Sequence, residues 1–380
     1  MKAHKCKVML SHFLLQMAYW PMSFFTRMKT MNKISFKPVW FDSMGAKSSA
    51  TLIKTPDVSV LIDPGAAGMQ PSFPASDEQK QRWHEEAYRA IRRASKEAQV
   101  VVISHYHYDH FTDFEKPLYA GKLVLAKDPN QWINDSQMGR SEKFYGNLCR
   151  AFEGRSLDEF MRDPEQKSYP DPMDELPVAR EKDFGDYNSR RQELLQKGRK
   201  WFEGRAKKWN TKKIIPELDL KGVRVRWIDG KAFQFGKTKL RFTNPLFHGI
   251  EFSRVGWVCP IVIECEKEKF IHSSDLNGPI IEDYAEWIIR EDPNVLVLDG
   301  PMTYLLGFTL NLINLKRTIE NASRIVSSVN SELIIYDHHL PRDRRFRERT
   351  KPVWSIAERE RKKLLTAAEY LGKEPVILTL

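Results

Sequence analysis

Residues 99–110 constrain this chain more than any other stretch, and they read QVVVISHYHYDH. The apolar run 100–103 has the character of a buried parallel strand. Residues of metal-binding types follow at once: His105, His107, Asp109 and His110. A single histidine is usually an ordinary polar side chain, but a structural role would not require so many groups with a high desolvation cost in one place. Imidazole and carboxylate together suit zinc, iron or manganese, so the segment predicts a metal site at a strand end.

The other histidines cluster in the same way. Of ten histidines in the chain, seven lie in four short segments that each come just after a strand-like run: His105, His107, His110, His248, His272, His338 and His339. Random placement would not produce that concentration.

These segments resemble the metallo-β-lactamase superfamily. The pattern H-x-H-x-D-H at 105–110 matches its signature, and the likeness covers about residues 35–127 and 221–350. Further segments resemble its other elements in the expected order: VSVLIDPG at 58–65, NPLFHG at 244–249, FIHSSD at 270–275 and IIYDHHLPR at 334–342. The motifs SHYHYDH, HSSDxxGP and DHHLxRD also resemble a small, uncharacterised prokaryotic branch of its metal-dependent hydrolases. The resemblance implies a fold and a reaction class but no substrate.

The implied fold is an α/β, four-layered αββα sandwich with a helical insertion. We expect a disordered extension over 1–33, the first half of the sandwich over 34–127, a charged helical insertion acting as a lid over 128–220, and the second half over 221–380. Strands are expected at 34–41, 50–53, 58–62 and 257–264, among others, and a helix at 76–98. The second half should end in a basic helix over 356–371.

The apolar stretch 8–25 follows three lysines and superficially resembles a signal sequence. His12, Gln16 and Pro21 interrupt it, and it is too short to span a bilayer. A membrane anchor is therefore the alternative to the disordered extension, and no stable membrane association is expected.

The resemblance also implies a ligand set. One ion would be held by His105, His107 and His248, a second by Asp109, His110 and His338, and Asp275 would bridge them. The final ligand is His338 or, alternatively, His339, which is otherwise a catalytic candidate. Asp63 would orient a ligand histidine, with Asp113 and Asp337 as further candidates for such a role. The cofactors are two divalent ions, zinc first, with iron and manganese as alternatives.

Two divalent ions can share a water and lower its pKa, so the implied nucleophile is a metal-bound hydroxide, which Asp109 would also steer. His272 either protonates a leaving group or points into the core. Arg342 either holds a substrate anion or forms an ordinary surface salt bridge.

The net charge of +11 is compatible with an anionic partner, such as a phosphorylated small molecule or nucleic acid, or with solvated lysines alone. Residues 180–213 hold twelve Lys or Arg against five Asp or Glu, interleaved with Trp201, Phe202 and Trp209. These aromatic residues could stack on a nucleic acid, but the favoured interpretation is that they dock a helix on its own protein. The four cysteines form no C-x-x-C pair, which fits a reducing cytoplasm.

The sequence therefore predicts a dinuclear hydrolase of a phosphodiester or another anionic phosphorylated substrate. One alternative is a hydrolase of a neutral ester, lactone or thioester. Another, of a different class, is a metal-binding nucleic-acid-associated protein without turnover. Oligomeric state is not indicated.

Overall fold

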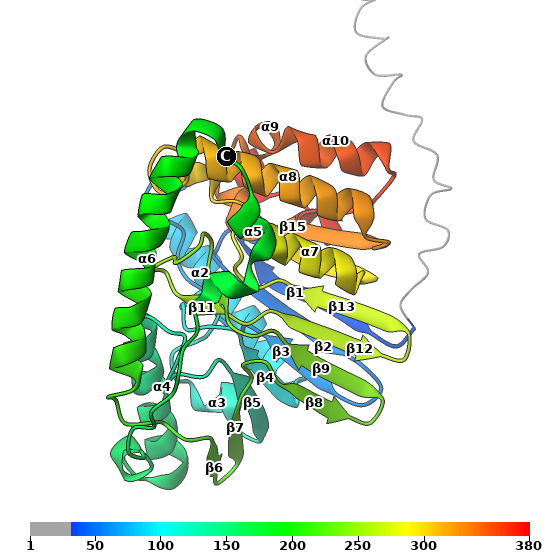
Figure 1. Cartoon of the computed structure of the whole chain (residues 1–380). Helices are drawn as coiled ribbons and strands as arrows, with labels where there is room; N and C mark the ends of the chain where they lie inside the picture. The colour runs from blue at the N-terminus through cyan, green and yellow to red at the C-terminus, as the bar shows by residue number, and fades with distance from the viewer. Residues whose placement is uncertain (1–31) are drawn as a thin grey trace, which may run out of the picture. The chain divides into compact units, whose positions relative to one another are not determined.

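Two seven-stranded β-sheets form the centre of the computed structural model, which describes residues 32–380 (Figure 1). The first sheet has the order β1 (Ser35–Phe41), β2 (Ser49–Lys54), β3 (Ser59–Ile62), β4 (Val100–Ile103), β5 (Lys122–Ala126), β7 (Val223–Trp227), β6 (Leu218–Leu220). The second has the order β16 (Leu364–Leu365), β15 (Leu333–Asp337), β14 (Val295–Asp299), β13 (Glu268–His272), β12 (Ile261–Cys265), β9 (Thr238–Phe242), β8 (Ala232–Phe235). A short hairpin joins β10 (Leu246–Phe247) to β11 (Trp257–Val258).

Each sheet contains a run of parallel strands, and the most buried of these are almost wholly apolar. The pairs β3–β4, β4–β5 and β5–β7 are parallel in the first sheet, as are β13–β14, β14–β15 and β15–β16 in the second. Every residue of β4, β14 and β15 is buried. Such runs are expected where both faces of a sheet are covered, and the carboxyl ends of parallel strands then meet at one edge.

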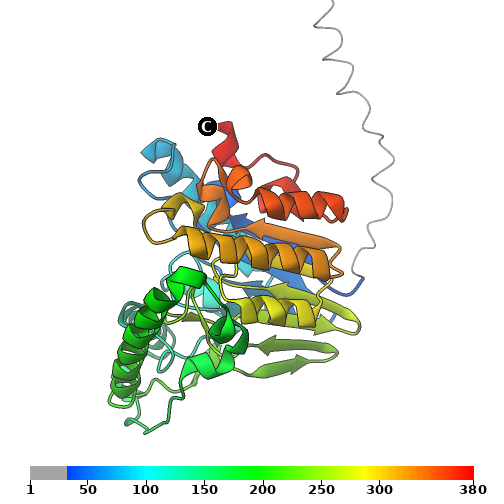
Figure 2. The ribbon, with the colours of Figure 1, turned by 45° about the horizontal axis from the view of Figure 1, so that its top comes forward.

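Helices cover the outer faces and complete the αββα sandwich that the sequence predicts. On the first sheet, α2 (Asp77–Ser95) begins at Ser76, whose side chain accepts the N–H of Gln79, and it buries Ala87 and Ile91. On the second, α7 (Glu282–Glu291), α8 (Leu312–Ser328) and α10 (Lys351–Arg359) lie side by side (Figure 2). The remaining α-helices are α3 (Lys116–Tyr119), α4 (Asp135–Glu153), α5 (Pro177–Glu181), α6 (Asn188–Trp209), α9 (Phe346–Arg349), α11 (Ala367–Tyr370) and α12 (Val376–Thr379).

The predicted insertion is mainly helical and packs on the sandwich. Its longest helix, α6, runs along one side of the molecule (Figure 1). Phe202 and Trp209 are buried, and Trp201 stacks on Trp257 with ring centroids 5.6 Å apart. The interpretation of these aromatic residues as a docking stripe is thus confirmed. The insertion also contributes a strand, β6, to the first sheet, which the sequence did not indicate.

Two predicted elements are wrong. The strand expected at 257–264 is broken at Cys259 and Pro260 into β11 and β12, because proline cannot donate to a ladder. The basic C-terminal helix expected over 356–371 ends at Arg359, and Leu364–Leu365 then forms β16 beside β15. Pairing with the sheet overrides helix propensity there.

The apolar stretch 8–25 lies outside the described residues. So does the predicted extension over 1–33, apart from its last two residues, 32 and 33. Within residues 32–380, no helix is both long enough and apolar enough to cross a membrane.

Candidate metal centre

The residues expected to bind metal lie together at one edge of the sandwich, in loops that follow four strands. The loop after β4 carries four of them, β10 leads into His248, and β13 leads into Asp275. The loop after β15 carries His338 and His339. Three overlapping sets have their ligand atoms within 4.8 Å of one another: His105, His107, His248 and Asp275; Asp109, His110 and His338; Asp275, His338 and His339.

Asp275 lies between the two predicted halves of the centre. Its Oδ2 is 2.7 Å from His248 Nε2 and 3.8 Å from His105 Nε2 on one side. On the other side it is 3.5 Å from His110 Nε2 and 3.7 Å from His338 Nε2. One carboxylate is therefore within reach of ligands from both sets, as a bridging role requires.

The ring nitrogens of the histidines approach one another closely. His105 Nε2 lies 3.1 Å from His107 Nδ1, and His110 Nε2 lies 3.1 Å from His338 Nε2. His339 is also close, with Nδ1 3.2 Å from Asp275 Oδ1. Both His338 and His339 thus stay within the cluster, and both remain candidates for the final ligand.

Each ligand histidine uses its other ring nitrogen outside the cluster. His110 Nδ1 lies 2.9 Å from Asp63 Oδ2, in the role predicted for Asp63. The further contacts are His105 Nδ1 with Ser104 Oγ at 3.0 Å, His107 Nε2 with Gln137 Nε2 at 3.3 Å, His248 Nδ1 with Asn277 Nδ2 at 3.0 Å and His338 Nδ1 with Asp42 Oδ1 at 3.1 Å. Such partners fix the ring orientation of a metal-binding imidazole.

Glycine shapes the turn that holds Asp63. A Cβ on Gly65 would lie 2.3 Å from the backbone nitrogen of Phe111, so only glycine allows this turn to pack against the ligand loop. Backbone strain gathers at the same edge. Asp63, Ser274, Asn277, His338 and His339 all have positive φ angles, between 40° and 57°. Strain of this kind persists where surrounding structure holds functional residues in place.

The donor set fits a divalent cation. Within the described residues, His248 Nε2, Asp275 Oδ1 and His339 Nδ1 are buried and approach one another only through the ion-pair contacts given above, none of which has the geometry of a hydrogen bond. Unsatisfied buried polar atoms are costly, and three of them facing one another need a common partner. A cation bound by imidazole and carboxylate supplies it.

The electrostatics keep most of these groups in the form that binds metal. Burial and the neighbouring His248 lower the pKa of His107 to about 3, and burial with the nearby imidazoles also lowers the pKa of His105. Burial alone would raise the pKa of Asp275, but the charges of His248 and His339 hold it well below its usual range. The pKa of His110 is instead raised to about 9: burial lowers it, but hydrogen bonds to Asp275 and Asp63 outweigh that effect. Burial likewise lowers the pKa of His338, but the charge of Asp42 and hydrogen bonds to Asp275 and Asp42 outweigh it and raise that pKa, so a metal must displace a proton from both His110 and His338.

His272 lies beside the centre but does not face it. Its Nε2 lies 3.0 Å from the carbonyl of Ser49, and its Nδ1 accepts the N–H of Ser274. Both ring nitrogens are engaged by backbone in the core. The placement argues against the catalytic role predicted for His272 and favours the alternative, a core position.

Arg342 is buried rather than open to a substrate. Its Nε donates to Asp42, its Nη1 donates to Tyr304 Oη at 3.1 Å, and its Nη2 donates to Asp109 Oδ2 at 3.4 Å. With its donors used in this way, Arg342 orients Asp109.

Two other carboxylates, Asp113 and Asp337, were further candidates for orienting a ligand histidine. Asp113 pairs with Lys143 on the surface, whereas Asp337 is buried and accepts backbone N–H groups, including that of His338.

Sequence reasoning missed Asp42, Gln137 and Asn277. Asp42 is the most connected of them: it accepts the N–H of Ser48 and of His339 in addition to contacting His338 and Arg342. Its position directly after an apolar strand, like that of Asp63, is the one signal that could have identified it. Gln137 and Asn277 carry no comparable signal.

Comparison with known proteins matches this chain to a superfamily model and to relatives of one named family within it. Residues 45–185 match the family model described as the metallo-beta-lactamase superfamily. A UPF0282 protein of Methanopyrus kandleri is 34% identical over 357 residues, covering 90% of this chain and 95% of its own. A UPF0282 protein of Methanocaldococcus jannaschii is 31% identical, covering 90% of this chain and 92% of its own. Among solved structures, the metallo-beta-lactamase fold protein YhfI of Bacillus subtilis is 11% identical with a TM-score of 0.39, covering 88% of this chain and 95% of its own.

Proposed function

This chain belongs to the UPF0282 family, a branch of the metallo-β-lactamase superfamily, and from that premise we propose that it is a dinuclear metal-dependent hydrolase of a phosphodiester or another anionic phosphorylated compound. The observation that carries the proposal is the position of Asp275 Oδ2, within 3.8 Å of imidazole nitrogens from both ligand sets. A protein that only needed a folded core would not gather these groups.

Two divalent ions, when bound, supply an activated water and polarise the electrophile. His105, His107 and His248 would hold one ion, and Asp109, His110 and His338 would hold the other. The side chain of Asp109 is 15% exposed, whereas those of His338 and Asp275 are 2% exposed. Asp109 is therefore more accessible than His338 or Asp275 and would accept a hydrogen bond from the attacking water. Arg342 holds Asp109 in that position.

Lys47 supports the choice of an anionic substrate. Its side chain is half-buried, and its ammonium forms no hydrogen bond or ion pair with any residue that the structure describes. Burial lowers its pKa, and so does the charge of Arg342, while Asp109 and Asp42 act in the opposite direction. Lys47 directly precedes Ser48, whose carbonyl lies 3.2 Å from His338 Nδ1, so its backbone lies beside the half of the centre that contains Asp109, His110 and His338. An uncommitted ammonium there would bind a phosphate oxygen of the substrate.

The test is turnover by the metal-loaded protein. We expect hydrolysis of a bis-aryl phosphodiester or of short RNA, lost in Asp109→Asn. Turnover of lactones or thioesters only, at rates insensitive to salt, would contradict the phosphodiester proposal and identify a neutral substrate instead. RNA binding that survives removal of the metal, without any hydrolysis, would favour a nucleic-acid-associated protein without turnover.

A further inference from the structure

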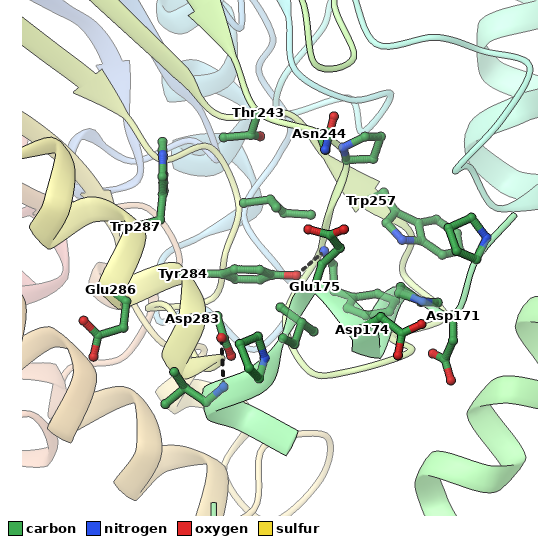
Figure 3. Close-up of a pocket in the computed structure, with 18 of the residues that line it drawn as sticks. Asp171, Asp174, Glu175, Thr243, Asn244, Trp257, Asp283, Tyr284, Glu286 and Trp287 are labelled. Carbon is green, nitrogen blue, oxygen red and sulfur yellow. Dashed lines mark hydrogen bonds between the residues drawn. The ribbon is translucent and has the colours of Figure 1, made fainter. Parts of the chain in front are cut away.

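A pocket that contains none of the metal-centre side chains lies between the insertion and the second half of the sandwich (Figure 3). Its volume is about 790 Å³, within the range of small-molecule sites. Three segments form most of it: residues 170–178, which we call the proline strap, residues 243–247 before His248, and one face of α7. Trp132 and Trp257 complete the lining. None of the predicted metal ligands lines it.

The walls of the pocket are largely aromatic. Trp132, Trp257, Tyr284 and Trp287 all line it, and prolines of the strap add further apolar surface. The faces of tryptophan and tyrosine rings attract cations, and tryptophan does so most strongly. Such walls suit a ligand with an aliphatic body and a positive charge.

The charged groups around the pocket have the sign that complements a cation. Five carboxylates line it, against one base, Arg290, although the chain as a whole carries +11. Most of these carboxylates have partners: Asp171 with Arg199, Asp174 with Arg180, Glu286 with Arg324, and Asp283 with the backbone N–H groups of Val178 and Ala179.

Glu175 differs from the other four carboxylates. Its side chain is exposed, its carboxylate forms no ion pair or hydrogen bond with residues in the described part of the chain, and Figure 3 draws it between Tyr284 and Trp257. Its charge is therefore available to a ligand.

Buried polar atoms on the wall also lack partners. Trp257 is 1% exposed, and its Nε1 has no acceptor among the described residues. Thr243 Oγ1 is likewise without a partner there. A buried indole N–H normally finds an acceptor, so a ligand acceptor that displaces the atoms covering Trp257 Nε1 would give it the partner it lacks.

We propose that this pocket binds an organic cation, an ammonium or guanidinium group on an aliphatic body. The cation would contact the carboxylate of Glu175 and the ring of Trp287, and a ligand with an acceptor group could also reach Trp257 Nε1 if the atoms covering it shift. The same chemistry is offered by a free polyamine and by a lysine or arginine side chain of a peptide. The inference does not depend on the proposed hydrolase activity.

The site adjoins the metal centre through the backbone. Phe247, on β10, donates its N–H to Tyr284 Oη at 2.8 Å, and the next residue is His248. A ligand that contacts Tyr284 therefore contacts a side chain that is hydrogen-bonded to β10, the strand that leads into the metal ligand His248.

The experiment is a tryptophan-fluorescence titration of the full chain with 1,6-diaminohexane, 1,6-hexanediol and N-acetyl-arginine amide. We expect the diamine to bind at least about tenfold more tightly than the diol of the same length, because only the diamine gains the cation–aromatic and carboxylate contacts. Tighter binding of the arginine amide than of the diamine identifies the peptide source, and the reverse identifies the free polyamine. Equal binding of diol and diamine, or no binding of either cation, overturns the proposal.

Glu175→Gln and Trp287→Leu should each weaken diamine binding by about tenfold. Glu203→Gln is the matched control, because Glu203 is exposed on α6, outside the pocket, and has no ion pair among the described residues. Equal losses in Glu175→Gln and Glu203→Gln would show a general charge effect and overturn the proposal. Urea unfolding of each variant verifies that it is folded before its binding is compared.

Discussion

Asp42 Oδ1 lies 3.1 Å from His338 Nδ1, although 296 residues separate the two along the chain. Asp42 is fully buried and also accepts the N–H of His339 and a guanidinium hydrogen of Arg342. Burial alone would raise its pKa, but the charges of Arg342 and His338 hold it far below the usual range. A single ionised carboxylate in the first half of the sandwich thus fixes the last ligand loop of the second half.

Asp42→Asn should weaken the ion held by Asp109, His110 and His338, because His338 loses the partner that orients its ring. Loss of such a support typically lowers metal affinity by roughly 10- to 100-fold. Zinc per chain, measured by mass spectrometry after dialysis against a zinc buffer, should fall from two toward one. Asp113→Asn is the control, since Asp113 pairs with Lys143 at the surface. Two retained ions in Asp42→Asn, with unchanged affinity, would contradict the role of Asp42.

Removing metal should destabilise the protein, because the cluster then contains buried polar atoms without partners. A ligand at 100 times its Kd contributes about 2.7 kcal/mol to the free energy of unfolding. Urea unfolding after chelation should therefore have a lower midpoint, and added zinc should restore it. His105→Ala should reduce this response, because it removes a ligand of one of the two proposed ions, whereas a variant of a histidine outside the cluster, His84→Ala, should keep it. Identical curves with and without metal would count against a bound cation.

The sequence predicted which side chains gather at this edge of the sandwich, because metal binding demands particular residue types directly after strands. His105, His107, Asp109 and His110 are close in sequence, so their proximity follows from one short loop. His248, Asp275 and His338 could be placed only by resemblance, since no local pattern brings β10, β13 and β15 to one edge. Asp42 and Asn277 were missed because hydrogen bonds between distant loops leave no periodic trace.

The roles of His272 and Arg342 depended on side-chain direction, which spacing does not determine. His272 ends β13 and turns toward the carbonyl of Ser49 on β2, whereas Asp275, three residues later, enters the cluster. Arg342 follows the histidine pair as predicted, but buried carboxylates surround it. The broken strand at Pro260 was the avoidable error, because proline inside an expected central strand argues against that strand.

Lys47→Met should raise the KM for a phosphodiester by about tenfold, since one charge-assisted contact to phosphate is lost. Hydrolysis of a neutral lactone, if it occurs, should be unchanged, and Lys47→Arg should retain most of the affinity for phosphodiester. Lys96→Met removes the same charge from an exposed helix end and serves as the control. An equal rise in KM in Lys47→Met and Lys96→Met would show that only the loss of net charge matters and would contradict a direct contact between Lys47 and phosphate.

The insertion is tied to the loop after His248 by buried ion pairs. Glu251 Oε1 lies 2.7 Å from Arg317 Nη2 on α8 and 3.1 Å from Arg191 Nη2 on α6. Arg317 Nη2 also lies 2.7 Å from Glu282 Oε2. These four side chains are between 3% and 7% exposed. Solvent therefore screens the network little.

This network should make stability fall in acid. Burial raises the pKa of Glu251, but Arg317 and Arg191 outweigh it and the net shift is downward. As pH falls, Glu251 is protonated in the unfolded chain first, near pH 4.3, and in the folded protein only at a lower pH. Its ion pairs therefore contribute fully to the free energy of unfolding above about pH 4.3, and this contribution is lost as pH falls through the folded pKa. Glu251→Gln should cost about 1.5–3 kcal/mol at pH 7 and flatten the decline of unfolding free energy between about pH 5 and 3. Urea unfolding at each pH measures both effects, with Glu203→Gln as the control. A decline as steep in Glu251→Gln as in the unmodified chain would assign the acid sensitivity to other carboxylates.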